Sequence, residues 1–278
     1  MNKCAVLIPH YNDPAGLNES LQSITPDERL CVFVVDDGSN IKPDEMKARD
    51  IYSGELNFIY LPSNKGIDHA LNAGLDRIGE SYAFIARLDC GDTCAKDRFS
   101  KQIEYLEAHP FVMLVGSAVT FVTEAGEISF TLRLPMTSDL IRRAMFSNCA
   151  FIHPTVMWRS SVMSEIGFYP TTYPAAEDYA LFWKFVERYR TANLPEVLVF
   201  SKLSPNGISA RRRAVQLRSR LRLQREHLTL NVASLLGVAK TLALMLIPRD
   251  IVTTMKRFRL GKDVLNDVAE DADRFIDA

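Results

Sequence analysis

The sequence lacks the features that would place it in several large classes of protein. Its 33 Lys and Arg balance 34 Asp and Glu, and without a positive excess we expect no affinity for nucleic acid. The five cysteines are odd in number and scattered, which argues against a disulfide framework and indicates a reducing cytoplasm. The most apolar region, residues 227–248, is interrupted by Lys240, whereas a membrane span needs roughly 20 apolar residues. The first residues, MNKCAVLIPHYN, show no pattern of a secretory signal.

The chain as a whole has no large excess of positive or negative charge, but two of its segments do. Between Arg211 and Lys262 there are 13 Lys or Arg and two acidic residues, whereas six acidic residues and one Arg follow from Asp263 onward. We therefore divide the chain into residues 1–209, one α/β domain, and residues 210–278, a basic helical extension with an acidic tail. The basic segment 211–262 is either a solvated helix face packed on the domain or a peripheral anchor on an anionic membrane surface.

What the first half does contain is an alternation of short apolar runs and amphipathic helical patterns. The runs at 4–8, 30–35, 56–61 and 81–86 are expected strands, and helical spacing of apolar residues separates them. Continuous apolar strands that alternate with helices predict a mostly parallel sheet covered on both faces. In such sheets, ligands bind outside the carboxyl ends of the strands.

A polar cluster lies at or just after the end of each of these four expected strands. The clusters are His10 to Asp13, Asp36-Asp37, Asn64-Lys65 and Asp89 to Asp92. Each one alone is consistent with an ordinary turn, and Asp92 or Thr93 could cap the next helix. The alternative is that Asp89 and Asp92 hold Mg²⁺ or Mn²⁺, because these hard cations bridge carboxylates to phosphates.

A second acidic site follows much later in the chain, in TYPAAEDYALFWKFVERY. Asp178 shares a helical stripe with Phe182 and Phe185, so we expect it on the inward face, whereas Glu177 falls on another. One interpretation is that both acids stabilise the N-terminus of a helix. The other is that Asp178 is a catalytic base, because one carboxylate could take the proton of an attacking hydroxyl while another site neutralises a leaving group.

Several motifs together resemble a known family. VLIPHYN, VVDDGSN, NKGIDHALNAGL, IARLDCGD, HPTVMWR and AEDYALFWKF, in this order, resemble the family-2 glycosyltransferases of the GT-A fold over about residues 3–209. The resemblance implies inverting transfer of a sugar from a UDP- or dTDP-sugar to a hydroxyl of a glycan or lipid-linked glycan. It also implies a bacterial, cytoplasmic enzyme of cell-surface polysaccharide biosynthesis, with a peripheral position on the plasma membrane as an open question.

The resemblance also assigns roles to individual residues. Pro9 and Tyr11 would frame the base pocket, Asp37 would bind the uracil or thymine edge, and Asp36 would support that corner. The remaining residues that it places at the donor are Asp13, Asn64, Lys65, Gly66, Asp68 and Arg87. The metal motif falls on Asp89, with Asp92 as the adjacent acid, and the catalytic pair is Glu177 and Asp178, with Asp178 as the general base.

One departure from the family pattern leaves an alternative open. Gly91 stands where the family most often has the second metal-binding acid, which is also consistent with a degenerate, non-catalytic subunit that binds a nucleotide-sugar. A sugar nucleotidyltransferase is the remaining alternative, but PHYNDPAGL lacks the glycine-rich phosphate loop that this activity needs after the first strand.

Overall fold

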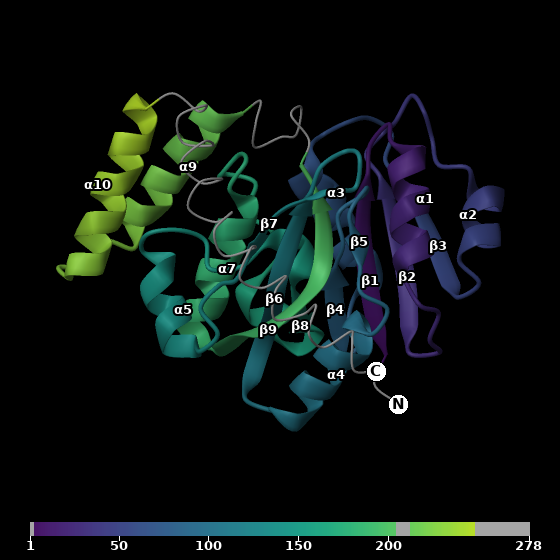
Figure 1. Ribbon diagram of the computed structural model, residues 1–278, viewed down its shortest axis with the longest axis horizontal. Helices are drawn as coiled ribbons and strands as arrows, with labels where there is room; N and C mark the ends of the chain where they lie inside the picture. Colours follow the sequence, from purple (N-terminus) through teal and green to yellow (C-terminus); the bar gives the residue numbers. More distant parts are fainter. Residues whose placement is uncertain (1–2, 204–211, 248–278) are drawn as a thin grey trace.

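The computed structural model describes residues 3–203 and 212–247. In these residues a nine-stranded sheet has the order β3-β2-β1-β4-β8-β6-β9-β5, with β7 paired to β6 (Figure 1). The strands are β1 (Cys4–His10), β2 (Leu30–Asp36), β3 (Glu55–Tyr60), β4 (Phe84–Arg87), β5 (Thr93–Cys94), β6 (Val112–Val122), β7 (Ile128–Leu132), β8 (Met157–Arg159) and β9 (Arg190–Lys202). The helices that cover the sheet are α1 (Pro14–Ser23), α2 (Glu45–Ile51), α3 (Ile67–Ile78), α4 (Arg98–Ala108), α5 (Ser138–Met145), α6 (Met163–Ile166) and α7 (Glu177–Arg188).

The half of the sheet that carries the polar clusters is parallel, as the alternating pattern predicted. Strands β3, β2, β1 and β4 run side by side in one direction. The register sets His10 opposite Asp36, and Asp36 opposite Tyr60. The polar ends of consecutive strands therefore meet at one edge, because parallel strands present their carboxyl ends on the same side.

Both faces of β1, β2 and β4 are buried, which is why these strands are apolar up to their polar last residues, whereas β3 is only partly buried. Leu7 of β1 contributes to a core under α3, α5 and α7, and its neighbour Val6 contributes to a second core under α1, α2 and α4. Alternate side chains of a strand point to opposite faces, so a strand covered on both sides needs no polar alternation.

The other half of the sheet is mixed. β8 runs antiparallel to β4 and β6, β7 to β6 and β5 to β9, whereas β6 and β9 are parallel over ten residue pairs, so the sheet as a whole is mostly parallel. The expected helix cap at Asp92 or Thr93 is wrong, because Thr93 lies in β5 and α4 begins only at Arg98. Pairing with β9, about a hundred residues away in the chain, decides this local conformation.

Two further helices, α9 (Arg213–Glu226) and α10 (Val232–Leu246), form a hairpin beside α5 and α7, on the left of Figure 1. Among the described helices, none has the length and apolar character to cross a membrane. The acidic tail from Asp263 and the part of the basic segment at 248–262 lie outside the described residues.

Candidate active site

The first corner of the site is built around the buried carboxylate of Asp36. Nδ1 of His10 lies 2.7 Å from Oδ1 of Asp36, and the amide of Ser39 donates to Oδ2 at 3.0 Å. Nε2 of His10 accepts from the amide of Asp13 at 3.2 Å, so the proton of the imidazole lies on Nδ1 and points at Asp36. Asp36 is therefore satisfied inside the protein, and it supports the corner rather than facing a ligand.

The second aspartate, Asp37, organises the loop that follows β3. Its two carboxylate oxygens accept from the amides of Lys65 and Gly66, each at 2.9 Å. Gly66 has φ 104°, a left-handed conformation that favours glycine. Lys65 and Asn64 remain exposed in this loop, and Tyr11, on the neighbouring loop, is 48% exposed. Asp37 is 4% exposed, and each of its oxygens keeps one lone pair for a ligand.

Asp89 is held by a buried arginine. Arg87 is fully buried, and its guanidinium donates to Oδ1 of Asp89 at 2.6 Å, to Nε2 of His153 at 3.3 Å and to the carbonyl of Leu7. His153 also lies 2.9 Å from the hydroxyl of Tyr169. Burial and the charge of Arg87 hold the pKa of His153 well below its usual value, so this histidine is neutral and accepts. The sequence placed Arg87 among the donor-binding residues, but its burial lets it act on a donor only through Asp89.

Asp92 and Gly91 limit the number of protein ligands that a cation could find beside Asp89. Oδ1 of Asp92 accepts from the amide of Lys202 at 3.0 Å, so this 7% exposed carboxylate is tied to the end of β9. Burial and the charge of Asp89 raise the pKa of Asp92 to about 7. Gly91 has φ 92°, a conformation that an aspartate rarely adopts. Within residues 3–203 and 212–247, no three His, Cys, Asp or Glu form a group that could hold a metal ion.

These donors therefore fit only one mode of cation binding. Asp89 keeps a third of its side chain exposed, and Mg²⁺ or Mn²⁺ commonly takes one or two carboxylates and completes its coordination with water and substrate phosphates. A cage made of protein ligands alone is not present in the described residues.

The catalytic pair predicted from the sequence opens α7. Asp178 is half-buried, and its Oδ1 accepts from the amide of Tyr179 at 2.7 Å. Glu177, expected on another stripe, is the more buried of the two at 8% exposure. The reason is that the N-terminus of α7 is enclosed on more than one side, so the helical stripe alone does not decide which acid is covered.

Burial separates the protonation states of this pair. Burial, with a smaller contribution from the charge of Asp89, raises the pKa of Asp178 to about 6. Burial and the charge of Asp178 raise the pKa of Glu177 to about 8. At neutral pH Asp178 is therefore ionised and Glu177 carries its proton. Asp89 and Asp68 act electrostatically on this pair, so the fold brings α7, the start of α3 and the end of β4 to one site.

Sequence reasoning missed the residues that support the corners. His10 and Ser39 hold Asp36, His153 orients Arg87, and the backbone of Lys202 fixes Asp92. His10 carried a signal, since it is a polar residue at the end of a buried strand. Ser39 lies in the same turn as Asp36, whereas His153 and Lys202 have no signal in the sequence, because their partners lie 66 and 110 residues away.

Comparisons with known proteins identify the family of this chain. The family model described as "Glycosyl transferase family 2" matches residues 5–167. The amylovoran biosynthesis glycosyltransferase AmsE of Erwinia amylovora is 31% identical over 234 residues, which cover 81% of this chain and 86% of the relative.

Two solved structures show the same fold at low sequence identity. S. aureus TarS 1-349 in complex with UDP-GlcNAc has a TM-score of 0.62 at 17% identity, over 86% of this chain and 71% of that one. The mannosyltransferase PcManGT of Pyrobaculum calidifontis, in complex with GDP-Man and Mn²⁺, has a TM-score of 0.60 at 18% identity, over 87% of this chain and 73% of that one.

Proposed function

The chain belongs to glycosyltransferase family 2 and is a nucleotide-sugar glycosyltransferase of the GT-A fold, and from this premise we propose that it is an inverting enzyme whose general base is Asp178. The observation that carries the proposal is the position of the acidic pair at the start of α7, where Glu177 is 8% exposed and Asp178 is half-buried. Oδ1 of Asp178 accepts from the amide of Tyr179 at 2.7 Å, and its other oxygen makes no hydrogen bond to another residue in the part of the chain that the structure describes. Burial and the charge of Asp89 raise the pKa of Asp178, which prepares this carboxylate to accept a proton.

The proposed reaction is a single displacement at the anomeric carbon of the donor sugar. The acceptor hydroxyl loses its proton to a carboxylate oxygen of Asp178 as its own oxygen forms the new bond to the anomeric carbon. The bond from that carbon to the diphosphate breaks, and the nucleoside diphosphate leaves with the electron pair. Attack from the face opposite the leaving group inverts the anomeric centre.

We propose a pyrimidine donor, UDP- or dTDP-sugar. Tyr11 has its ring exposed for stacking on a base, with Pro9 before it in β1. Asp37 has free lone pairs for the edge of the base, and Asp13, Asn64, Lys65, Gly66 and Asp68 line the same edge of the sheet. The UDP-GlcNAc complex of TarS supports a donor of this kind, while the GDP-Man complex of PcManGT shows that the fold also accepts a purine.

We propose that a divalent cation, Mn²⁺ or Mg²⁺, binds with the donor. Asp89 would be its main protein ligand, with the diphosphate and water as the others, and Asp92 would lie behind it. When bound, the cation would neutralise the charge that develops on the diphosphate. Arg87 would keep the carboxylate of Asp89 in place for it.

The acceptor that we propose is a hydroxyl of a glycan or lipid-linked glycan in cell-surface polysaccharide biosynthesis. The similarity to AmsE supports this pathway. We retain the division into a catalytic domain at 1–209 and a helical extension at 210–278, and we propose a cytoplasmic enzyme that attaches to the inner face of the plasma membrane through the extension.

A screen of nucleotide-sugars tests the proposal. Thermal shifts with UDP-, dTDP- and GDP-sugars, each with and without Mn²⁺, would be followed by assays of nucleoside diphosphate release. We expect the largest shift with a pyrimidine donor and Mn²⁺, and slow donor hydrolysis that requires Asp178. Binding without any turnover would favour the non-catalytic subunit that Gly91 left open.

A further inference from the structure

Helix α10 is amphipathic in the reverse of the usual sense. Its buried residues are small or polar: Ser234, Gly237 and Thr241. The residues that face outward are apolar except for Lys240 and are Val232, Leu235, Leu236, Ala239, Leu242, Ala243, Met245 and Leu246. Leu246 is 86% exposed and Leu236 62%. A surface helix of a globular protein normally buries its apolar side and exposes its polar side to water. The apolar outward face of α10 therefore indicates contact with an apolar partner.

The orientation of α10 is imposed by the protein beneath it. A Cβ atom on Gly237 would overlap the carbonyl oxygen of Phe146, so the helix backbone lies directly on the end of α5. Arg213, at the start of α9, donates to the carbonyls of Leu244 and Ile247 at 2.8 and 2.9 Å and caps the C-terminus of α10. These contacts prevent α10 from rolling to hide its leucines. The apolar surface, which we call the outer face, is therefore a fixed property of the fold.

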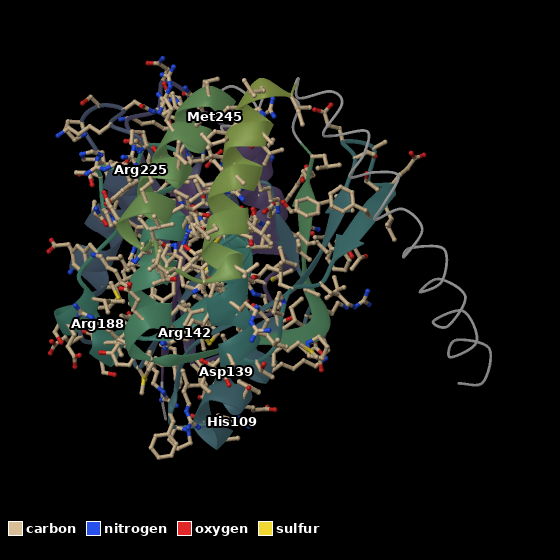
Figure 2. The ribbon with its side chains drawn as sticks, turned by 90° about the vertical axis from the view of Figure 1, so that its left-hand side faces the viewer. His109, Asp139, Arg142, Arg188, Arg225 and Met245 are labelled. Atoms are coloured by element: carbon tan, nitrogen blue, oxygen red, sulfur yellow. The ribbon has the colours of Figure 1, made fainter. Side chains whose placement is uncertain are left out.

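Basic side chains lie on the same side of the molecule as the outer face. Residues 212–247 carry seven Lys or Arg and one acidic residue, and Arg218 and Arg225 of α9 are exposed. Figure 2 looks onto α10 from this side, with Met245 at its upper end and Arg142, Arg188 and Arg225 on the same side of the molecule. Two acids on this side are paired, Glu226 with Arg222 at 2.9 Å and Glu187 with His227 at 2.7 Å, whereas Asp139 of α5, labelled below Arg142 in Figure 2, is an exposed acid.

We propose that the outer face of α10 lies in the interface of an anionic lipid bilayer, with the arginines of α9 on the headgroups. The 15 residues of α10 are too few to span, so the helix would lie in the plane of the membrane. A second copy of this chain is not the preferred occupant, because two such basic surfaces repel each other. In an anionic bilayer the headgroups compensate the positive charge, and the acyl chains accept the apolar side chains.

This placement would bring the membrane to the acceptor side of the catalytic site, and so rests on the function proposed above. Ser219 of α9 donates to the carbonyl of Pro174 at 2.9 Å, three residues before Glu177. The imidazole of His227 stacks on Trp183 of α7, with ring centroids 4.3 Å apart and nearly parallel. The hairpin is thus joined to the helix that carries the base, and a lipid-anchored acceptor held at the same surface would approach Asp178.

Vesicle flotation of the full-length protein tests the proposal. Vesicles of phosphatidylcholine alone and vesicles with added phosphatidylglycerol would be compared at low and high salt. We expect flotation with the anionic vesicles at low salt and release at high salt, since salt screens surface charge. The double variant Leu235→Glu/Leu246→Glu should lower the partition coefficient at least about tenfold, because each leucine withheld from the interface forfeits a substantial apolar contribution.

Matched controls separate insertion from other effects. Met46→Glu adds the same charge at an 81% exposed apolar residue of α2, across the sheet from the hairpin, and should float like the wild type. Leu236→Trp should show a blue-shifted emission on addition of anionic vesicles. Donor hydrolysis in solution should be unchanged in the double variant, so that loss of lipid binding is distinguishable from failure of the proposed catalytic function.

Three results would overturn the proposal. The first is the absence of flotation at any salt, and the second is equal flotation of the double variant and the wild type. The third is a wild-type dimer in solution that the double variant dissociates while neither protein binds vesicles, which would make a second copy of the chain the occupant of the outer face.

Discussion

Asp178→Asn removes one charge from the proposed site and little else. The carboxylate oxygen that accepts from the amide of Tyr179 at 2.7 Å is replaced by an amide oxygen, which accepts equally well, so the start of α7 should keep its shape. Donor affinity should stay within about twofold. Turnover should fall at least ~100-fold, the scale on which a general base contributes, which corresponds to about 2.7 kcal/mol in the activation free energy.

The assignment of Asp178 as the base also predicts how kcat/KM depends on pH. The pKa of Asp178 is raised to about 6, chiefly by burial and further by the charge of Asp89. A base with this pKa is about 90% ionised at pH 7 and about 10% at pH 5. Wild-type kcat/KM, which reports the free enzyme, should therefore rise about tenfold between these two pH values and then level off. The residual kcat/KM of the Asp178→Asn variant should not show this rise between pH 5 and pH 7.

Release of the nucleoside diphosphate, followed by a coupled assay with a pyrimidine donor, measures both effects. Asp139→Asn is the control, since Asp139 is an exposed acid in the first turn of α5 and was not assigned to the site (Figure 2). Turnover within a few-fold of the wild type, or a wild-type profile without a limb near pH 6, would refute the assignment of Asp178 as the base.

Three more predictions follow from the same contacts. Asp37→Ala should weaken UDP binding about 5- to 150-fold, or 1–3 kcal/mol, because it removes the base contact and the acceptor of two loop amides; equal affinity of the wild type for GDP and UDP in calorimetry would contradict the pyrimidine assignment. Arg87→Met should lower the free energy of unfolding by about 2–4 kcal/mol, since it leaves the partly buried carboxylate of Asp89 unpaired, and a loss below ~1 kcal/mol in denaturant titration would argue against that pairing. The folded-state pKa of Glu177, about 8, lies above its usual value, so its contribution to stability is complete at low pH and is lost as the pH rises toward 8. Glu177→Gln should therefore melt a few degrees above the wild type at pH 9 and close to it at pH 4; a difference that does not change with pH would contradict the raised pKa.

The strands and helices that position the site could be predicted because their signals are local. Every residue of β1 and β2 except Pro9 is buried, and this double-sided burial is written in the sequence as continuous apolar runs. The amphipathic spacing of α3 and α7 is equally visible. Because these strands are parallel, the ends of β1, β2 and β4 lie at one edge of the sheet, so the sequence predicted that Asp36, Asp37 and Asp89 lie near one another. The motifs that contain these residues also identified the family to which the chain belongs.

Contacts between distant segments decided the rest. Asp92 bonds to an amide 110 residues away, and Thr93 is a strand residue only because β9 lies beside it. Arg87 looks like a donor-binding cation in the sequence, but the paths of β1 and β8 enclose it and turn it onto Asp89. The sequence likewise showed that α10 is apolar and its surroundings basic, without showing which side of the helix is covered. Packing of Gly237 on Phe146 and the hydrogen bonds of Arg213 to the end of α10 turn the leucines outward, because the face that a helix buries depends on the shape of its neighbour as well as on its own pattern.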